Sequence, residues 1–190
     1  LSLQGMLWGA AALGIKTVMV ATGDFVALGQ RATTTTVRDV DVLQLVQMAR
    51  DAGLQTGVVF DPHPEANGFQ RAIERLERKA AAGAQFAVTQ PVYDEAAVDQ
   101  LHKSLKHIDI PVILGILPLR TPRHAEFLHT RVAGIAVPQD VRDRMRQAAD
   151  PVAEGAQNAR EILALAQDRF AGACLMPPFD HYEVMFDILK

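Results

Sequence analysis

Short, uniformly apolar segments alternate along the chain with longer segments in which apolar residues recur every three or four positions. The short segments cover residues 17–21, 56–60, 86–89, 111–116 and 173–176. Apolar residues at consecutive positions are typical of strands that are buried on both faces of a parallel sheet. The pattern therefore predicts five buried parallel strands.

The longer segments predict helices between these strands. Residues 40–51, 69–82 and 95–106 each place apolar side chains on one stripe, as expected of a helix that covers a sheet. Thr121–Pro122 and Asp150–Pro151 predict two more helix starts, because each pair supplies a capping side chain followed by proline at the first helical position.

Strands that alternate with helices indicate an α/β fold with right-handed crossover connections. Both a doubly wound sheet and a (β/α)8 TIM barrel produce this pattern. A complete barrel needs about 250 residues, whereas this chain has 190. We expect residues 1–190 to form a single domain, and a barrel would have to lack roughly its first three strands here.

Composition argues against several classes of function. Lys and Arg number 19 and Asp and Glu number 22, which disfavours a basic surface for nucleic acid. The apolar stretches at 6–15 and 17–22 are separated by Lys16 and fall short of a membrane span, which needs about 20 residues. The one cysteine, Cys174, fits a reducing compartment, so we expect a cytoplasmic protein without nucleic-acid or membrane partners.

Sequence motifs for common catalytic sites are missing. The six histidines show no metal-ligand spacing on a single predicted helix, so we expect no metal. Glycine-rich phosphate-binding loops and the Gly-x-Ser-x-Gly motif of serine hydrolases do not occur. The chemistry must therefore come from residues that the fold brings together.

Polar residues follow the predicted strands at their carboxyl ends, where parallel α/β folds bind ligands. Thr22–Gly23–Asp24 follows the first strand, residues 61–65 with His63 follow the second, and Gln90 ends the third. Every strand leaves the sheet through a polar loop, so this clustering alone is weak evidence. It nevertheless defines the candidate site.

Each candidate also has a purely structural interpretation. Asp24 would tighten a turn, His63 would lie in a solvent-facing loop, and Lys79 would interact with the C-terminal end of its helix. Gln90 is as compatible with a ligand role as with a structural one, because a buried amide needs hydrogen-bond partners. Tyr93 is expected to pack beneath the following helix.

The segments 14–24, 63–66, 79–90 and 115–118 resemble the methylenetetrahydrofolate reductase family in order and spacing. Residues 91–93 and 125–127 are most similar to the reductase module of bifunctional homocysteine S-methyltransferase/methylenetetrahydrofolate reductase proteins. This resemblance implies a TIM barrel, truncated at its N-terminus, of which the chain carries about the fourth to eighth strands, the C-terminal two-thirds. It also allows for fusion to a homocysteine S-methyltransferase domain. Five strands of an eight-stranded barrel would leave apolar edges and interior surface exposed, so we expect either further residues upstream or burial of that surface in a homo-oligomer.

The family's activity is the reduction of 5,10-methylenetetrahydrofolate to 5-methyltetrahydrofolate with NAD(P)H and FAD, in one-carbon metabolism and methionine biosynthesis. By resemblance, Thr22, Gly23, His63 and Lys79 would bind FAD. Asp24 would be the catalytic residue beside the flavin and the folate pterin, contributing to the binding of both. The resemblance assigns folate binding to Gln90 as well, because its amide both donates and accepts hydrogen bonds.

Several positions depart from the family's pattern. The acidic proton donor of the family lies upstream of this chain, Val59 replaces a common tyrosine, and Pro122 replaces an aromatic residue. Asp180 lies near the position of an arginine that some members use for the folate tail. Two alternatives stay open: a non-catalytic pterin- or flavin-binding module that serves a methyltransferase domain, and an unrelated phosphate-binding barrel isomerase.

Overall fold

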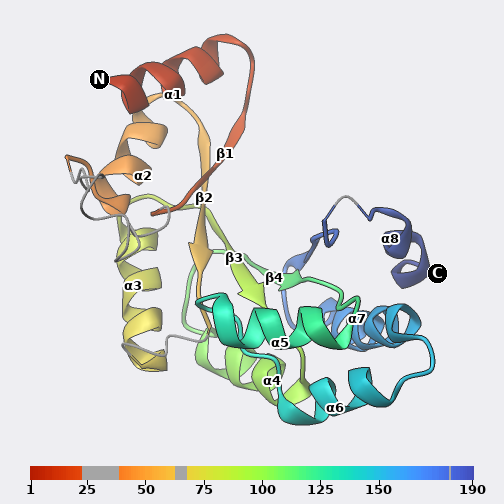
Figure 1. The fold of residues 1–190 in the computed structure, drawn as a ribbon. Coiled ribbons are helices and arrows are strands. Elements are labelled where there is room, and N and C mark those ends of the chain that lie inside the picture. Colours follow the sequence, from red (N-terminus) through yellow and green to blue (C-terminus); the bar gives the residue numbers. More distant parts are fainter. Residues whose placement is uncertain (23–38, 63–67, 180) are drawn as a thin grey trace, which may run out of the picture.

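Five parallel strands lie side by side in the order in which they occur in the sequence (Figure 1). This computed structural model describes residues 1–22, 39–62, 68–179 and 181–190. A strand order that follows the sequence is that of a barrel, since a doubly wound sheet reverses its order. The strands are β1 (Thr17–Val20), β2 (Gln55–Phe60), β3 (Phe86–Pro91), β4 (Val112–Ile116) and β5 (Gly172–Leu175).

All five predicted strands are confirmed to within about two residues at each end. Among the described residues β1 and β5 do not pair, so the sheet is a partial barrel that stays open. The architecture is therefore an α/β fold consistent with part of a TIM barrel.

The predicted helices are also present, and the predicted caps make the expected hydrogen bonds. Thr121 accepts a hydrogen bond from the backbone N–H of His124, and Asp150 accepts from Val152 and Ala153. The helices are α1 (Ser2–Ala12), α2 (Val42–Asp51), α3 (Phe69–Ala81), α4 (Glu95–Ser104), α5 (Pro122–Arg131), α6 (Gln139–Gln147), α7 (Pro151–Gln167) and α8 (Glu183–Ile188).

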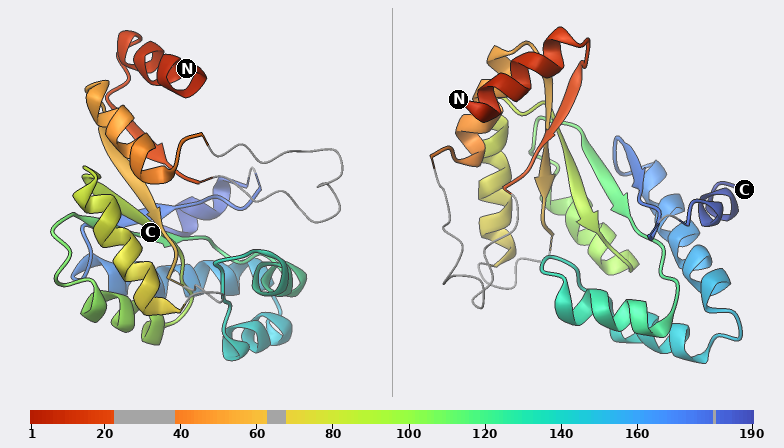
Figure 2. Two further views of the ribbon diagram at one scale, coloured as in Figure 1. Left: turned by 90° about the vertical axis from the view of Figure 1, so that its left-hand side faces the viewer. Right: turned by 45° about the horizontal axis from the view of Figure 1, so that its top comes forward.

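The two faces of the sheet differ in burial. Alternate strand residues such as Val58, Ala87 and Leu114 are fully buried in the main core, against the helices. Helices α2, α3 and α7 contact the strands on this side (Figure 2). Residues between the buried ones, such as Val88 and Ile113, are only partly buried, so the opposite face is open in the part of the chain that the structure describes.

A second apolar cluster supports the carboxyl ends of β3 and β4. Its buried residues come from α5, α6, the connection between these helices and the segments that follow the two strands, among them Tyr93, Leu119 and Val137. The buried amide of Asn158 on α7 donates a hydrogen bond to the backbone carbonyl of Tyr93 at 3.0 Å. The segments that leave β3 and β4 are thus held by packing and by a hydrogen bond.

Candidate active site at the strand ends

Gln90 lies at an irregularity where β3 pairs with β4. The register shifts between Val88 and Pro91, which interrupts the regular ladder. The Thr89 hydroxyl bridges the interruption: it accepts a hydrogen bond from the Gly115 N–H at 2.9 Å and donates one to the Gln90 carbonyl at 2.8 Å. Thr89 is 1% exposed, so this bridge is shielded from water and fixes the backbone at Gln90.

The side chain of Gln90 belongs to the open face of the sheet. Burial alternates along β3, with Ala87, Thr89 and Pro91 buried and Val88 and Gln90 only partly buried. The Gln90 amide makes no hydrogen bond with another described side chain or backbone group. An amide near the end of a strand, with its donors and acceptor unused, is available to a ligand.

Gly115 permits the close approach of β3 and β4 at this point. A Cβ atom on Gly115 would lie 2.3 Å from the backbone oxygen of Thr89, closer than any side chain tolerates. Thr89 and Gly115 are therefore positioning residues for Gln90 that the sequence interpretation missed. The signal that could have revealed them is the glycine inside a strand, which often marks a close backbone approach.

Lys79 reaches from α3 to the neighbouring strand β2. Its ammonium group donates a hydrogen bond to the Val59 carbonyl at 2.6 Å. Burial lowers the pKa of Lys79, the positive charge of Arg75 lowers it further, and the carboxylate of Asp61 acts in the opposite direction. This contact connects Lys79 to the strand whose carboxyl end carries the candidate site, rather than only to the last turn of its own helix.

The remaining candidates divide into two groups. Thr22 is exposed directly after β1, the strand that pairs with β2. Gly23, Asp24 and His63 lie outside the described residues, so their roles stay predictions. The structure thus brings Thr22, Lys79 and Gln90 to three consecutive strands of one sheet.

The structure places two of the positions that depart from the family's pattern, Val59 and Pro122, in regular secondary structure. Val59 pairs with Val88 in the register of β2 and β3 and is partly buried, and Pro122 occupies the first turn of α5. Tyr93 is buried, as predicted. Asp180 lies outside the described residues.

The segments after β4 and β5 meet at a histidine. The ring of His124 lies 5.4 Å from that of Phe179, and its Nδ1 atom accepts a hydrogen bond from the Arg120 N–H at 3.4 Å. Burial lowers the pKa of His124, and the charge of Arg120 lowers it further. The neutral imidazole is therefore the favoured form at this end of the sheet.

Comparison with known proteins connects this geometry to a family. The family model described as methylenetetrahydrofolate reductase matches residues 1–168. The chain belongs to this family. A probable methylenetetrahydrofolate reductase (NADPH) from Caenorhabditis elegans is 22% identical over 138 residues, which make up 70% of this chain and 21% of that protein.

A solved structure supports the fold. An uncharacterized protein from Clostridium thermocellum, which binds two copies of 5-methyl-5,6,7,8-tetrahydrofolic acid, superposes with a TM-score of 0.59 at 16% identity. The match covers 92% of this chain and 70% of that one. At a sequence identity this low, the structural likeness establishes the fold alone.

Family membership confirms the resemblance seen in the sequence. The chain spans about a fifth of the length of the nematode relative, 21%, so the activity of a whole reductase is a proposal here. Fusion to a methyltransferase domain and truncation at the N-terminus stay predictions. No helix in the described part of the chain is long and apolar enough to cross a membrane.

Proposed function

We propose that the intact protein reduces 5,10-methylenetetrahydrofolate to 5-methyltetrahydrofolate with NAD(P)H and bound FAD. The observation that carries the proposal is the Gln90 amide, which has no hydrogen-bond partner among the described residues and whose backbone is fixed at the end of β3, in a chain of this family. The Clostridium thermocellum protein of the same fold binds a methylated tetrahydrofolate, which supports a folate as the ligand.

The residues at the strand ends fit a flavin cofactor and a pterin. The Lys79 ammonium carries three N–H donors, of which one is used on Val59, so donors remain for a diphosphate or ribose oxygen. FAD supplies hydride chemistry that side chains do not provide. In this proposal Thr22, Gly23 and His63 complete the cofactor contacts.

The pterin half of the site rests on Asp24 and Gln90. The Gln90 amide would pair with the polar edge of the pterin ring in the plane of the ring. Asp24 would hold the opposite polar groups and adjust the charge around the flavin.

A second candidate function is a non-catalytic module that binds a flavin or pterin for a methyltransferase domain. Val59 and Asp180 favour it, since they stand at or near positions where members of the family have a tyrosine and an arginine. This alternative keeps ligand binding but removes turnover. Hydride transfer therefore distinguishes the two functions.

The test begins with the visible absorbance spectrum of the purified intact protein, which should show bound flavin. Under anaerobic conditions NADH or NADPH should bleach the flavin band, and methylenetetrahydrofolate should restore it. Bound flavin that neither nucleotide reduces would favour the non-catalytic module. Failure to bind flavin on reconstitution would overturn the proposal.

Two variants test the assigned residues, each with a control of the same type. Lys79→Met should weaken FAD binding, whereas Lys106→Met at an exposed position should not. Gln90→Leu should raise KM for the folate about tenfold or more, because the loss of one good hydrogen bond is worth about 1.4 kcal/mol. The exposed Gln100→Leu control should leave KM unchanged.

A further inference from the structure

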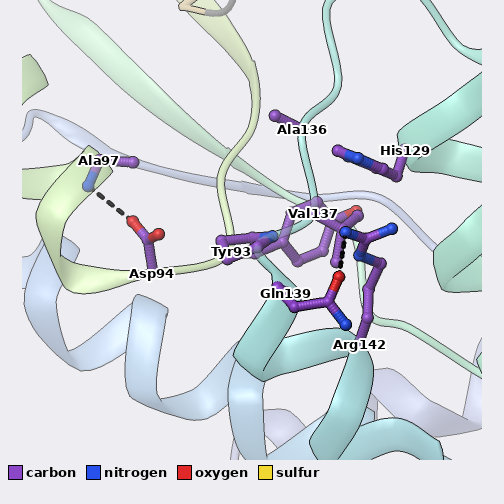
Figure 3. Close-up of a pocket in the computed structure, with 9 residues that line it drawn as sticks. Tyr93, Asp94, Ala97, His129, Ala136, Val137, Gln139 and Arg142 are labelled. Atoms are coloured by element: carbon purple, nitrogen blue, oxygen red, sulfur yellow. Dashed lines mark hydrogen bonds between the residues drawn. The ribbon is translucent and has the colours of Figure 1, made fainter.

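A cavity of about 190 Å³ lies between the start of α4, the end of α5 and the start of α6 (Figure 3). We call it the Tyr93 pocket. It belongs to the second apolar cluster and contains none of the residues assigned to the flavin or to folate. Its walls are formed by Tyr93, Asp94, Ala97, His129, Ala136, Val137, Pro138, Gln139 and Arg142.

Three buried polar atoms of this pocket have no hydrogen-bond partner among the described residues. They are Tyr93 Oη, His129 Nδ1 and Arg142 Nε. Tyr93 is only 3% exposed, so its hydroxyl cannot turn to bulk water. Buried polar atoms are nearly always paired, and three exceptions that converge from three segments on one cavity indicate a missing partner.

The chemistry of the three atoms defines what that partner offers. Arg142 Nε is always a donor, and His129 Nδ1 donates in one of its two neutral tautomers. Burial raises the pKa of Tyr93, so its hydroxyl stays protonated and also donates. A partner that satisfies all three atoms presents acceptor oxygen.

The charges around the pocket favour an uncharged partner. Arg142 Nη1 lies 3.0 Å from a carboxylate oxygen of Glu126, and Nη2 donates to Gln139 Oε1 at 2.6 Å. The guanidinium charge is therefore already balanced. Asp94 is the carboxylate in the wall, and it caps α4 by accepting from the Ala97 N–H. An added anion would meet the Asp94 carboxylate in the wall and a guanidinium whose charge Glu126 already balances.

The rest of the wall is apolar and the volume is small. Ala97, Ala136, Val137 and Pro138 supply methyl and methylene surface. An engineered cavity of about 150 Å³ in another protein binds benzene, so this volume suits a single six-membered ring. We propose that the Tyr93 pocket binds a small uncharged ring compound whose carbonyl oxygen accepts hydrogen bonds from Tyr93, His129 and Arg142.

The test titrates the intact protein with δ-valerolactam, a six-membered ring with one carbonyl. Binding is followed by NMR through the methyl resonances of Ala97 and Ala136 and the ring nitrogens of His129. Saturable shifts at these groups are expected. Cyclobutanecarboxylate, which has the same number of heavy atoms and a negative charge, should bind more weakly.

Variants assign the binding to the pocket. Tyr93→Phe removes one donor and should weaken lactam binding about tenfold, the effect of one lost hydrogen bond. Tyr182→Phe, at the other tyrosine of the chain, should change nothing. Ala136→Leu fills the cavity and should abolish binding. Because this variant keeps Tyr93, it still tests the pocket if the Tyr93→Phe variant fails to fold.

Three results would overturn the proposal. The first is the absence of saturable shifts up to the solubility limit of the lactam, which would mean that the cavity holds water only. The second is lactam binding that both pocket variants leave unchanged. The third is tighter binding of the carboxylate than of the lactam, which would contradict an uncharged ligand. Flavin content and folate reduction do not enter these measurements, so the proposed function is tested separately.

Discussion

At the scale of single residues, the junction of β3 and β4 depends on two residues, Thr89 and Gly115, that cannot be replaced without disturbing the backbone. The Thr89 hydroxyl replaces a missing ladder contact, and Gly115 lets the two backbones meet. This junction holds only the backbone of Gln90, and among the described residues the side-chain amide has no partner and is available to a ligand. The positioning of a binding residue here depends on a hydroxyl and on the absence of a methyl group.

Replacement of Gly115 by alanine should destabilise the fold by about 1–3 kcal/mol or more, the usual cost of overpacking a core. The new methyl group would have to displace the Thr89 carbonyl, which is backbone and cannot turn aside. Urea unfolding of Gly115→Ala measures the loss. Gly172→Ala is the matched control in a neighbouring strand, because a Cβ there meets nothing within 4 Å and should cost little.

His124 should make stability depend on pH. Its folded-state pKa is lowered below 6.5, so the unfolded chain binds more protons in the window between the two values. Stability should therefore rise with pH through that window and fall as the solution becomes more acidic. His124→Asn, which keeps an acceptor near the Arg120 N–H, should flatten the change in unfolding free energy between about pH 7 and 5. An unchanged slope would contradict this.

At the scale of elements, α7 fastens the carboxyl ends of β3 and β4 to the helical layer. Gly155 brings the helix against the backbone of Leu119, and one turn later Asn158 donates to the Tyr93 carbonyl. Both contacts are made to main-chain atoms of segments that leave the strands. The helix therefore controls the path of these segments as well as covering the sheet.

Alanine substitutions at two helical glycines should have opposite effects. Glycine inside a helix normally costs about 1 kcal/mol relative to alanine, so Gly5→Ala in α1, where a Cβ meets nothing within 4 Å, should stabilise the protein slightly. Gly155→Ala should destabilise it, because the Cβ would lie 1.8 Å from the Leu119 carbonyl oxygen. Thermal unfolding of both variants gives the comparison, and equal shifts would refute the packing role of Gly155.

The elements were predictable from the sequence because burial imposes a period on it. Strands apolar at consecutive positions and helices with one apolar stripe follow directly from contact with a core, and Thr121 and Asp150 mark helix starts by local hydrogen bonding. The Thr89–Gly115 junction and the Tyr93 pocket were not predictable in this way. Their partners come from separate segments, and only the packed structure brings them together.

At the scale of the whole molecule, the described residues cover one face of the sheet and helix α1 only weakly. Met19 on β1 is 46% exposed, and α1 contains no buried residue although Trp8 and Met6 lie on it. Most of the main core lies between β2, β3, β4 and the helices behind them, and β1 contributes the buried Val20 to it. Local stability therefore differs along the chain: it is high in the central strands β2 to β4 and low in α1 at the edge of the sheet.

Amide hydrogen exchange should reveal this gradient in the intact protein. Backbone amides of α1 should exchange much faster than those of β3 and β4, because local opening of α1 exposes little additional apolar surface. Mass spectrometry of proteolytic fragments measures both segments in one experiment. Equal protection of α1 and the central strands would show that another part of the protein covers α1.

The succession of strands bears on how the protein is made. Each of the strands β2 to β5 pairs with the one synthesised just before it, so within the described sheet these pairings do not wait for a distant later segment. During synthesis the amino-terminal part of a chain emerges first and folds first. The sheet can thus be extended strand by strand on the ribosome, with each β/α unit adding to an edge that the preceding unit has already formed.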